Sequence, residues 1–221
     1  TTTVVAADRV RRIVDAAGDR TGRGAWAAVL AAGGVSALPG GDHANWLPES
    51  LELWWRAAVG DKDISVRVDV VVPPRATDPA VVRTTGLIDG DIVADVILHA
   101  RLRSSAKSRT SLRPVAGAAE TWTRVITDEQ VQGFCAAVGT TSWSTAGLSW
   151  AAIPSRPQPV VPVSLLVGEA ARLLPVESGA LAVEIHAPVL AGALLHWARS
   201  GPQVWVGAPD AAPALQFELD A

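Results

Sequence analysis

One order of elements occurs twice along the chain, and this repeat limits most strongly what the chain can fold into. Apolar residues at helical spacing occupy 10–18 and again 131–139, and each run ends in a glycine. Thr127 and Gln130 fit a capping box, which predicts that the second of these helices begins near residue 128. The chain has 221 residues, of which 49% are apolar, so it can bury the core that two such units require.

A proline and an apolar segment follow each of these helices. Pro48 lies near the start of WLPESLELWWRAAVG, and Pro162 lies near the start of VPVSLLVGEAARLLP. Because proline is tolerated at the first position of a helix, Pro48 and Pro162 are each expected to begin a buried helix. The carboxylates of these helices, Glu52 and Glu169, would lie either at an exposed edge or in a pocket, where they could serve as acids. We expect the exposed edge for both. The stretch 20–45 before the first segment has small apolar residues and no polar face, and we interpret it as a lid or tunnel wall.

Each half then ends in segments whose apolar residues alternate with polar ones, which is typical of antiparallel strands with one buried face. The fold class is therefore expected to be α+β, with two tandem units that each wrap a curved antiparallel sheet around a central helix. We place the units at 1–104 and 120–221, joined by a basic linker at 105–119. The two units can pair edge to edge. The alternating segments are 64–74, 80–90, 91–103, 180–189, 193–200, 202–209 and 214–220.

Composition argues against several classes of partner. The net charge of −3 is dispersed along the chain, so no nucleic-acid partner is expected. The longest apolar run, 25–38, is shorter than the ~20 residues that span a bilayer, so no membrane partner is expected. The single cysteine, Cys135, cannot form an internal disulfide and is expected to be buried, which fits a reducing cytoplasm. The four histidines lack the spacing of metal ligands, and neither a metal nor a cofactor is expected.

Three segments carry a resemblance to a known family. ITDEQVQGFCAAVG, PVVPVSLLVGEAARLLP and VEIHAPVLAGALL are similar to the first helix, the central helix and the following strand of the MaoC-like acyl-thioester hydratases and dehydratases. The resemblance implies a double hotdog fold. This family places an aspartate and a histidine in a GDxNPxH motif after the first helix. In the second copy Thr140 and Thr145 stand at those two places, whereas the first copy keeps Asp19 but has Gly24 in place of the histidine.

The loop GGDHAN supplies the remaining candidate catalytic groups. Hydration or dehydration of an acyl thioester needs a base for the α-proton and an acid at the β-oxygen. His43 is the candidate base, while Asp42, or a water held by Asn45, could act at the β-oxygen. The same loop is also what a turn before a helix looks like, so a purely structural role stays open.

The substrate is expected to lie at the start of the predicted helix at 46–60. The N–H groups of Glu49 and Ser50 would be unpaired in its first turn, and the resemblance implies that a thioester carbonyl binds at that helix end. Nine Trp, two Phe and no Tyr mean that indoles build most of any bulky pocket wall. Trp46 and Trp54 are the candidate wall residues.

Three functions remain open at this level. The first is a MaoC-like dehydratase or hydratase, or a cyclase using related enolate and Michael chemistry, acting on a hydrophobic acyl or polyketide thioester. The second is a hotdog thioesterase, which needs only a base that aims water at the same carbonyl. The third is a non-catalytic scaffold or acyl-chain-binding subunit. The expected partner is acyl-CoA or an acyl carrier protein thioester, and the tandem unit could form a homodimer.

Overall fold

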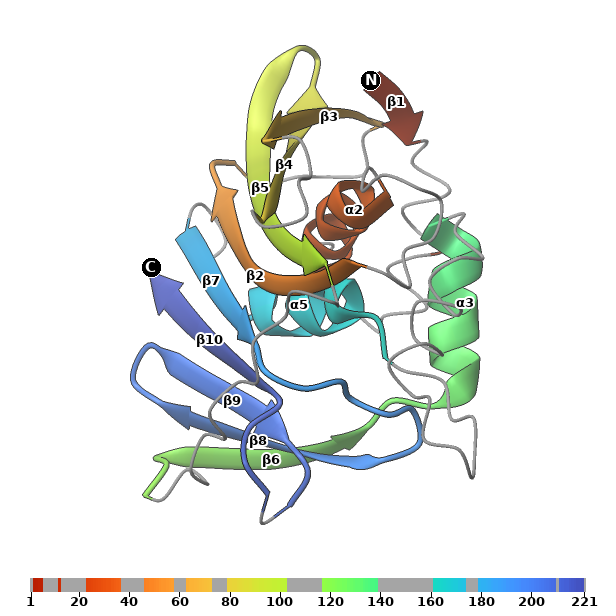
Figure 1. The fold of residues 1–221 in the computed structure, drawn as a ribbon. Coiled ribbons are helices and arrows are strands. Elements are labelled where there is room, and N and C mark those ends of the chain that lie inside the picture. The colour runs from red at the N-terminus through yellow and green to blue at the C-terminus, as the bar shows by residue number, and fades with distance from the viewer. Residues whose placement is uncertain are drawn as a thin grey trace.

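A single ten-stranded sheet dominates the structure, which is a computed structural model describing residues 2–5, 12, 23–36, 46–57, 63–72, 79–102, 117–138, 161–173, 179–209 and 211–220. The sheet is antiparallel and curves around helices α2 and α5, with α3 to one side (Figure 1). The helices are α2 (Arg23–Ser36), α3 (Asp128–Val138) and α5 (Val163–Ala171). The strands are β1 (Thr2–Val5), β2 (Trp46–Trp55), β3 (Ile64–Val72), β4 (Ala80–Ile88), β5 (Asp91–Leu102), β6 (Glu120–Val125), β7 (Gly179–Ile185), β8 (Leu194–Ser200), β9 (Gln203–Gly207) and β10 (Leu215–Asp220).

The strand order repeats in the two parts of the chain. The sheet runs β1-β3-β4-β5-β2-β7-β10-β9-β8-β6. Each half contributes five strands, and both halves place them in the same order. Counted from the outer edge of the sheet, this order is the first, third, fourth, fifth and second strand of that half in the sequence, so the second strand of each half lies at the centre. We call β1–β5 with α2 the N-terminal half, and β6–β10 with α3 and α5 the C-terminal half. The halves join where residues 50–55 of β2 pair with residues 179–184 of β7.

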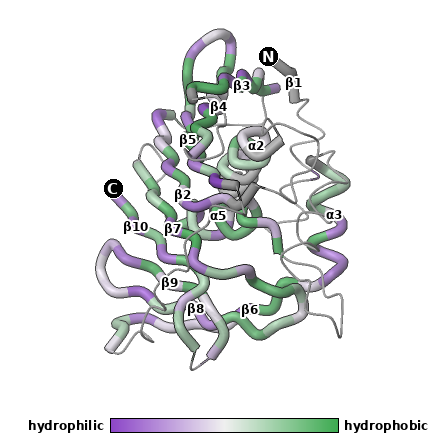
Figure 2. The backbone as a smooth tube through the Cα atoms, in the orientation of Figure 1, coloured by the Kyte–Doolittle hydropathy of each residue, from purple (hydrophilic) through white to green (hydrophobic). Residues whose placement is uncertain are grey.

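Seven of the strands follow from the alternating segments that the sequence predicts, namely β3, β4, β5, β7, β8, β9 and β10. In β7, for example, buried Leu181, Val183 and Ile185 alternate with exposed Ala182 and Glu184. Figure 2 shows this alternation of hydrophobic and hydrophilic residues along the strands. One face of the sheet therefore packs on the helices, and the other faces outwards.

The predicted capping box of α3 is confirmed by two reciprocal hydrogen bonds. Gln130 N–H donates to Thr127 Oγ1 at 3.2 Å, and Thr127 N–H donates to Gln130 Oε1 at 3.0 Å. Together they satisfy two amides that a helix start leaves free. The helix predicted over 10–18 lies outside the described residues except for Arg12, which is helical.

The helix predicted from Pro48 onwards is wrong, because residues 46–55 form strand β2. Leu51, Leu53 and Trp55 are buried, Glu52 between them is exposed and Trp54 is half-buried, which is a period of two. Pro48 lies where the register with β5 shifts, and β7 does not pair with β2 at that position. A strand tolerates proline at such an irregular and one-sided position because no ladder hydrogen bond is lost there.

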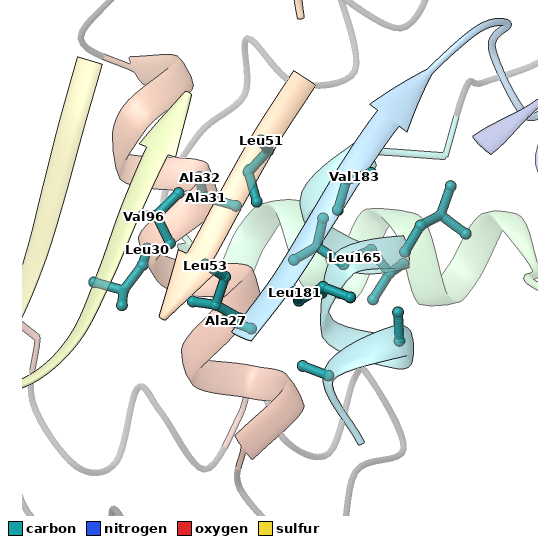
Figure 3. Packing of buried hydrophobic residues seen from close by; sticks show 14 of the residues in the cluster. Ala27, Leu30, Ala31, Ala32, Leu51, Leu53, Val96, Leu165, Leu181 and Val183 are labelled. Atoms are coloured by element: carbon teal, nitrogen blue, oxygen red, sulfur yellow. The ribbon is translucent and has the colours of Figure 1, made fainter. Parts of the chain in front are cut away.

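The central helix of the N-terminal half is instead α2, within the stretch interpreted above as a lid or tunnel wall. Its lack of a polar face is explained by burial on all sides, since Trp26, Ala27, Val29 and Ala32, which point in different directions around the helix axis, are each at most 7% exposed. Figure 3 shows α2 and α5 packed under β2 and β7, where side chains of both halves form one cluster. Among the described residues, no helix is both long and apolar enough to cross a bilayer.

Candidate functional site

The amino end of α5 is fixed by the segments that enter and flank it. Val161 N–H donates to the Val189 carbonyl at 2.8 Å, which ties the entry of the helix to the segment after β7. Pro162 has φ −56° and ψ 132°, so it is not helical and acts as the N-cap. The helix therefore starts at Val163, one residue later than the sequence pattern predicts.

The first turn of α5 combines unpaired amides with a buried hydroxyl. Helix geometry leaves the N–H groups of Val163 and Ser164 without an intrahelical partner, whereas Leu165 N–H donates to the Pro162 carbonyl at 2.9 Å. The Ser164 side chain is buried, and its Oγ has no hydrogen-bond partner among the described residues. Buried hydroxyls normally have partners, so Ser164 calls for an explanation. Three donors at the positive end of a helix suit a carbonyl oxygen or an oxyanion.

Two arginines surround a buried carboxylate further along the same helix. Glu169 accepts hydrogen bonds from Arg124 of β6 and from Arg172, the latter at 3.2 Å. The Glu169 side chain is 7% exposed, so our expectation of an exposed edge is wrong for this residue, although Glu52 is exposed as expected. The Glu169 carboxylate thus anchors α5 to β6, the strand at the sheet edge.

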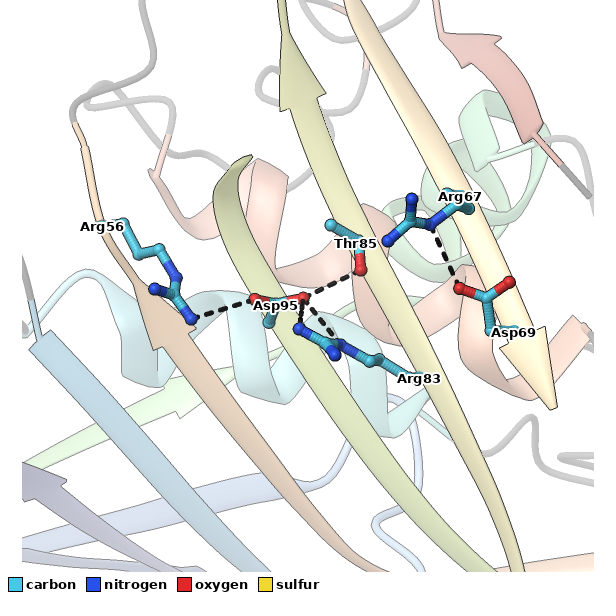
Figure 4. Close-up of polar contacts among 6 residues, drawn as sticks. All are labelled: Arg56, Arg67, Asp69, Arg83, Thr85 and Asp95. Atoms are coloured by element: carbon cyan, nitrogen blue, oxygen red, sulfur yellow. Dashed lines mark hydrogen bonds and ion pairs between the residues drawn. The ribbon is translucent and has the colours of Figure 1, made fainter. Parts of the chain in front are cut away.

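A second buried carboxylate, Asp95, lies on the outer face of the N-terminal half (Figure 4). Its Oδ1 accepts from Thr85 Oγ1 at 2.8 Å and from Arg83 Nε at 3.0 Å, and its Oδ2 accepts from Arg56 at 3.3 Å. The side chain of Asp95 is 3% exposed. This carboxylate is paired on both oxygens, which fits a structural role that joins β4 and β5 to Arg56, the residue that follows β2.

The predicted catalytic residues Asp19, Asp42, His43 and Asn45 lie outside the described residues. Their roles therefore stay predictions. Trp46 lies within the described backbone, as the first residue of β2.

The argument for carbonyl binding at Glu49 and Ser50 fails, because they lie in a strand and not in the first turn of a helix. The Glu49 carboxylate accepts from Arg101 Nε at 3.0 Å, and Ser50 is paired with His99 on one side and Glu184 on the other. Strand pairing uses backbone groups that a helix start would leave free. The amino end of α5 is the place where this carbonyl-binding argument holds.

The predicted wall residue Trp54 faces outwards, since it alternates with buried Leu53 and Trp55. It lines a groove of about 410 Å³ on the outer face of β2, β7 and β10. The groove floor includes Ala180 and Ala182, and its carboxylates are Glu52, Glu218 and Asp220. Trp54 is thus on the opposite face of the sheet from α5.

Two other classes of reactive site find no support among the described residues. Cys135 is buried in α3, and burial raises the pKa of its thiol to about 11, so it remains protonated at neutral pH. No three His, Cys, Asp or Glu side chains within the described ranges come together as metal ligands.

Ser164 is the candidate that sequence reasoning missed. It is the one hydroxyl in α5, whose other residues apart from Glu169 are Val, Leu, Gly and Ala. The sequence contains a signal for it, because a lone polar residue in the first turn of an apolar helix indicates a candidate binding group. The requirement for an acid and a base selected aspartate and histidine instead.

Comparison with solved structures identifies the fold. HtdX of Mycobacterium tuberculosis matches with a TM-score of 0.66 at 12% identity, covering 99% of both chains. A MaoC-like dehydratase from Phytophthora capsici matches with a TM-score of 0.66 at 10% identity, covering 98% of this chain and 92% of that one. The acyl-CoA thioesterase II TesB2 of Mycobacterium marinum matches with a TM-score of 0.54 at 10% identity, covering 89% and 88%.

These matches confirm the expected hotdog fold of MaoC-like proteins, and identities this low establish the fold alone. No protein-family model matches the sequence, and no curated protein matches it significantly.

Proposed function

We propose that the chain is an acyl-thioester enzyme of the hydratase or dehydratase type, whose substrate carbonyl binds at the amino end of α5. The observation that carries this proposal is Ser164, a buried hydroxyl without a partner among the described residues, beside two amides that the helix leaves unpaired. The shared fold with MaoC-like dehydratases supports the same function.

The donors at Val163 and Ser164 would stabilise the charge that develops on the thioester oxygen. Removal of the α-proton places negative charge on that oxygen, and fixed donors in a water-poor site stabilise it without reorganisation. The β-hydroxyl then leaves with a proton as water, which gives the α,β-unsaturated thioester; hydration is the reverse. This chemistry needs an acid and a base and no cofactor.

The acid and base are proposed from the sequence. His43 would remove the α-proton, and Asp42, or a water held by Asn45, would act at the β-oxygen. Asp19 is the carboxylate that retains its place in the family motif. A cyclase would use the same enolate in a Michael addition, for example on a carrier-bound polyketide chain.

Thioester hydrolysis is the second candidate, because a TesB2 thioesterase shares the fold and attack of water on the same carbonyl would use the same donors. A non-catalytic acyl-binding subunit is the third. It would use the donors for affinity, without an acid or a base.

We further propose that the chain is a double hotdog, with units at 1–104 and 120–221 and a linker at 105–119. The identical strand order of the two halves supports this division. The thioester would be carried by coenzyme A or by an acyl carrier protein, and the tandem unit could form a homodimer. A reducing cytoplasm suits Cys135, which is buried and free.

Two assays on one protein preparation separate these functions. Incubation with a saturated acyl-CoA in deuterated buffer should exchange the α-protons, and the matching enoyl-CoA should gain water; both products are seen by mass spectrometry. Release of free thiol without exchange would identify a thioesterase, and binding without either reaction would identify an acyl-binding subunit. An absence of binding would overturn the proposal.

The catalytic assignment is tested by His43→Ala, with His196→Ala of β8 as the matched control. Loss of general-base catalysis lowers turnover about 10²-fold or more. The His196 variant should keep its activity. Full turnover by the His43 variant would remove this residue from the mechanism while leaving the carbonyl site in place.

A further inference from the structure

The two central helices pack against the sheet in different ways. Helix α2 lies close to β3, β4 and β5. Helix α5, in contrast, has α2 as its main neighbour and lies further from its own strands. An acyl chain that starts at the amino end of α5 thus meets two separate layers, one under each helix. The side chains in these layers decide which layer can receive it.

The layer between α2 and its strands is closed. A Cβ added at Gly34 would lie 3.2 Å from Thr84 Oγ1, and one added at Gly33 would lie 3.2 Å from Thr84 Cγ2. From the sheet side, a Cβ added at Gly86 would lie 3.3 Å from Leu30 Cδ2. Ordinary van der Waals contact of an added Cβ is 3.4–4 Å, so this layer has no room for an additional methyl group at any of these three positions. An acyl chain is much larger.

The interface between α2 and α5 is closed as well. The two helices pack directly on each other, and both contain small buried residues, such as Ala27 and Ala31 in α2 and Ala170 and Ala171 in α5. Small residues allow the two helices to approach closely, and close-packed helices leave no channel between them.

The layer between α5 and its strands is built from long side chains. Arg124 of β6 reaches Glu169, while Trp197 stacks on Trp122 at 5.8 Å and on Phe217 at 5.9 Å between ring centroids. Part of this layer reaches solvent, since the Arg124 side chain is 27% exposed and Trp122 is half-buried. Long side chains can change rotamer to make room for a ligand. Helix α2 cannot make room in this way where its glycines place its backbone directly against the sheet.

We propose that the acyl chain of the substrate is confined to the C-terminal half, in the layer between α5 and β6–β10, and that α2 closes the N-terminal half to it. The aromatic row of Trp122, Trp197 and Phe217 would form the wall along the chain. Leu30 and Gly86 would set acyl selectivity by keeping the other layer shut. This inference rests on the proposed thioester site at Ser164.

Photo-crosslinking with an acyl-CoA that carries a diazirine at the end of a medium-length chain tests the route. Crosslinked peptides should come from α5 and β6–β10 and be lost when excess unlabelled acyl-CoA is added. Crosslinks to α2 or β3–β5 that the competitor removes would overturn the inference while leaving the thioester site intact. An absence of competable crosslinking together with an absence of acyl-CoA binding would overturn the proposed function itself.

Two matched leucine variants sharpen the result. Leu30→Ala opens the layer under α2 and should add crosslinks to β4, whereas Leu166→Ala on α5 should leave the crosslinks within the C-terminal half. Thermal melting of both variants shows that they are folded. An unchanged crosslink pattern in a folded Leu30 variant would show that Leu30 does not control access.

Discussion

At the scale of single residues, the most informative group is a buried hydroxyl that makes no hydrogen bond to any described residue. Ser164 is 1% exposed, and its Oγ has no partner among the described residues. A buried polar group without a partner costs about 1–3 kcal/mol of stability. Such a cost is typical of sites where a ligand completes the hydrogen bonding.

Ser164→Ala should therefore separate activity from stability. Removal of one oxyanion donor lowers turnover about 10²-fold. The free energy of unfolding should stay unchanged or rise by about 1 kcal/mol, because the orphan hydroxyl is lost and alanine favours the helix. Turnover and denaturant unfolding measure the two effects. Ser200→Ala, at an exposed position in β8, should change neither; a fall in stability for the Ser164 variant would instead identify a structural hydroxyl.

The Cys135 thiol should make stability depend on pH in the alkaline range. Burial raises its pKa from 9.0 to about 11, so the folded state holds this proton where the unfolded state has lost it. The contribution is complete below pH 9 and is lost as the pH rises towards 11, with a slope of about 1.4 kcal/mol per pH unit between these two values. Unfolding in denaturant at several pH values measures this slope. Cys135→Ala should have a shallower slope, and an equal slope in both proteins would contradict the assignment.

At the scale of elements, the attachment of α5 to β6 depends on one carboxylate. Glu169→Ala would leave Arg124 and Arg172 facing each other beside a buried helix. Breaking a buried ion pair costs about 3–5 kcal/mol, but these arginines are 27% and 33% exposed, so we expect about 2 kcal/mol. Asp69→Ala is the matched control because its pair with Arg67 is exposed, and it should cost under about 0.5 kcal/mol. Urea unfolding compares them, and equal effects would contradict this role of Glu169.

The elements also show how far sequence reasoning reaches. Strands β3–β5 and β7–β10 were predictable because polar and apolar residues largely alternate when one face is buried. The start of α3 was predictable because the Thr127–Gln130 capping box is a local signal. These features depend only on residues close in sequence.

Helix α2 and strand β2 could not be predicted in the same way. Pro48 fits a helix start as well as an irregular strand position, and only the pairing partners of β2 decide between them. In α2, burial on every side removes the amphipathic pattern that identifies a helix. The candidate site shared this limit, because the carbonyl-binding amides were assigned to Glu49 and Ser50 through the wrong helix. Ser164 becomes notable only once its burial is known.

At the scale of the whole molecule, the two halves share one core. Strands β2 and β7 pair over six residues, and α2 packs directly on α5. Separation of the halves would expose two strand edges and the apolar faces of both helices, which is unfavourable. We therefore expect the described residues to fold as one unit.

The full chain should accordingly unfold in a single cooperative transition. Calorimetry should give one peak whose calorimetric and van't Hoff enthalpies agree, and circular dichroism and tryptophan fluorescence should report the same midpoint. Leu53→Ala at the β2–β7 junction should lower that midpoint without splitting the transition. Two resolved transitions in the unmodified chain would show that the halves fold independently.

The pairing of β2 with β7 within one polypeptide also has a consequence for what each half can become. In an assembly of two identical chains, every substitution occurs twice, so a change that improves one site alters its twin. Two halves that lie in one polypeptide are free of this constraint. Here the N-terminal half has glycines where α2 meets its strands, whereas the C-terminal half has the buried Ser164 hydroxyl in the first turn of α5.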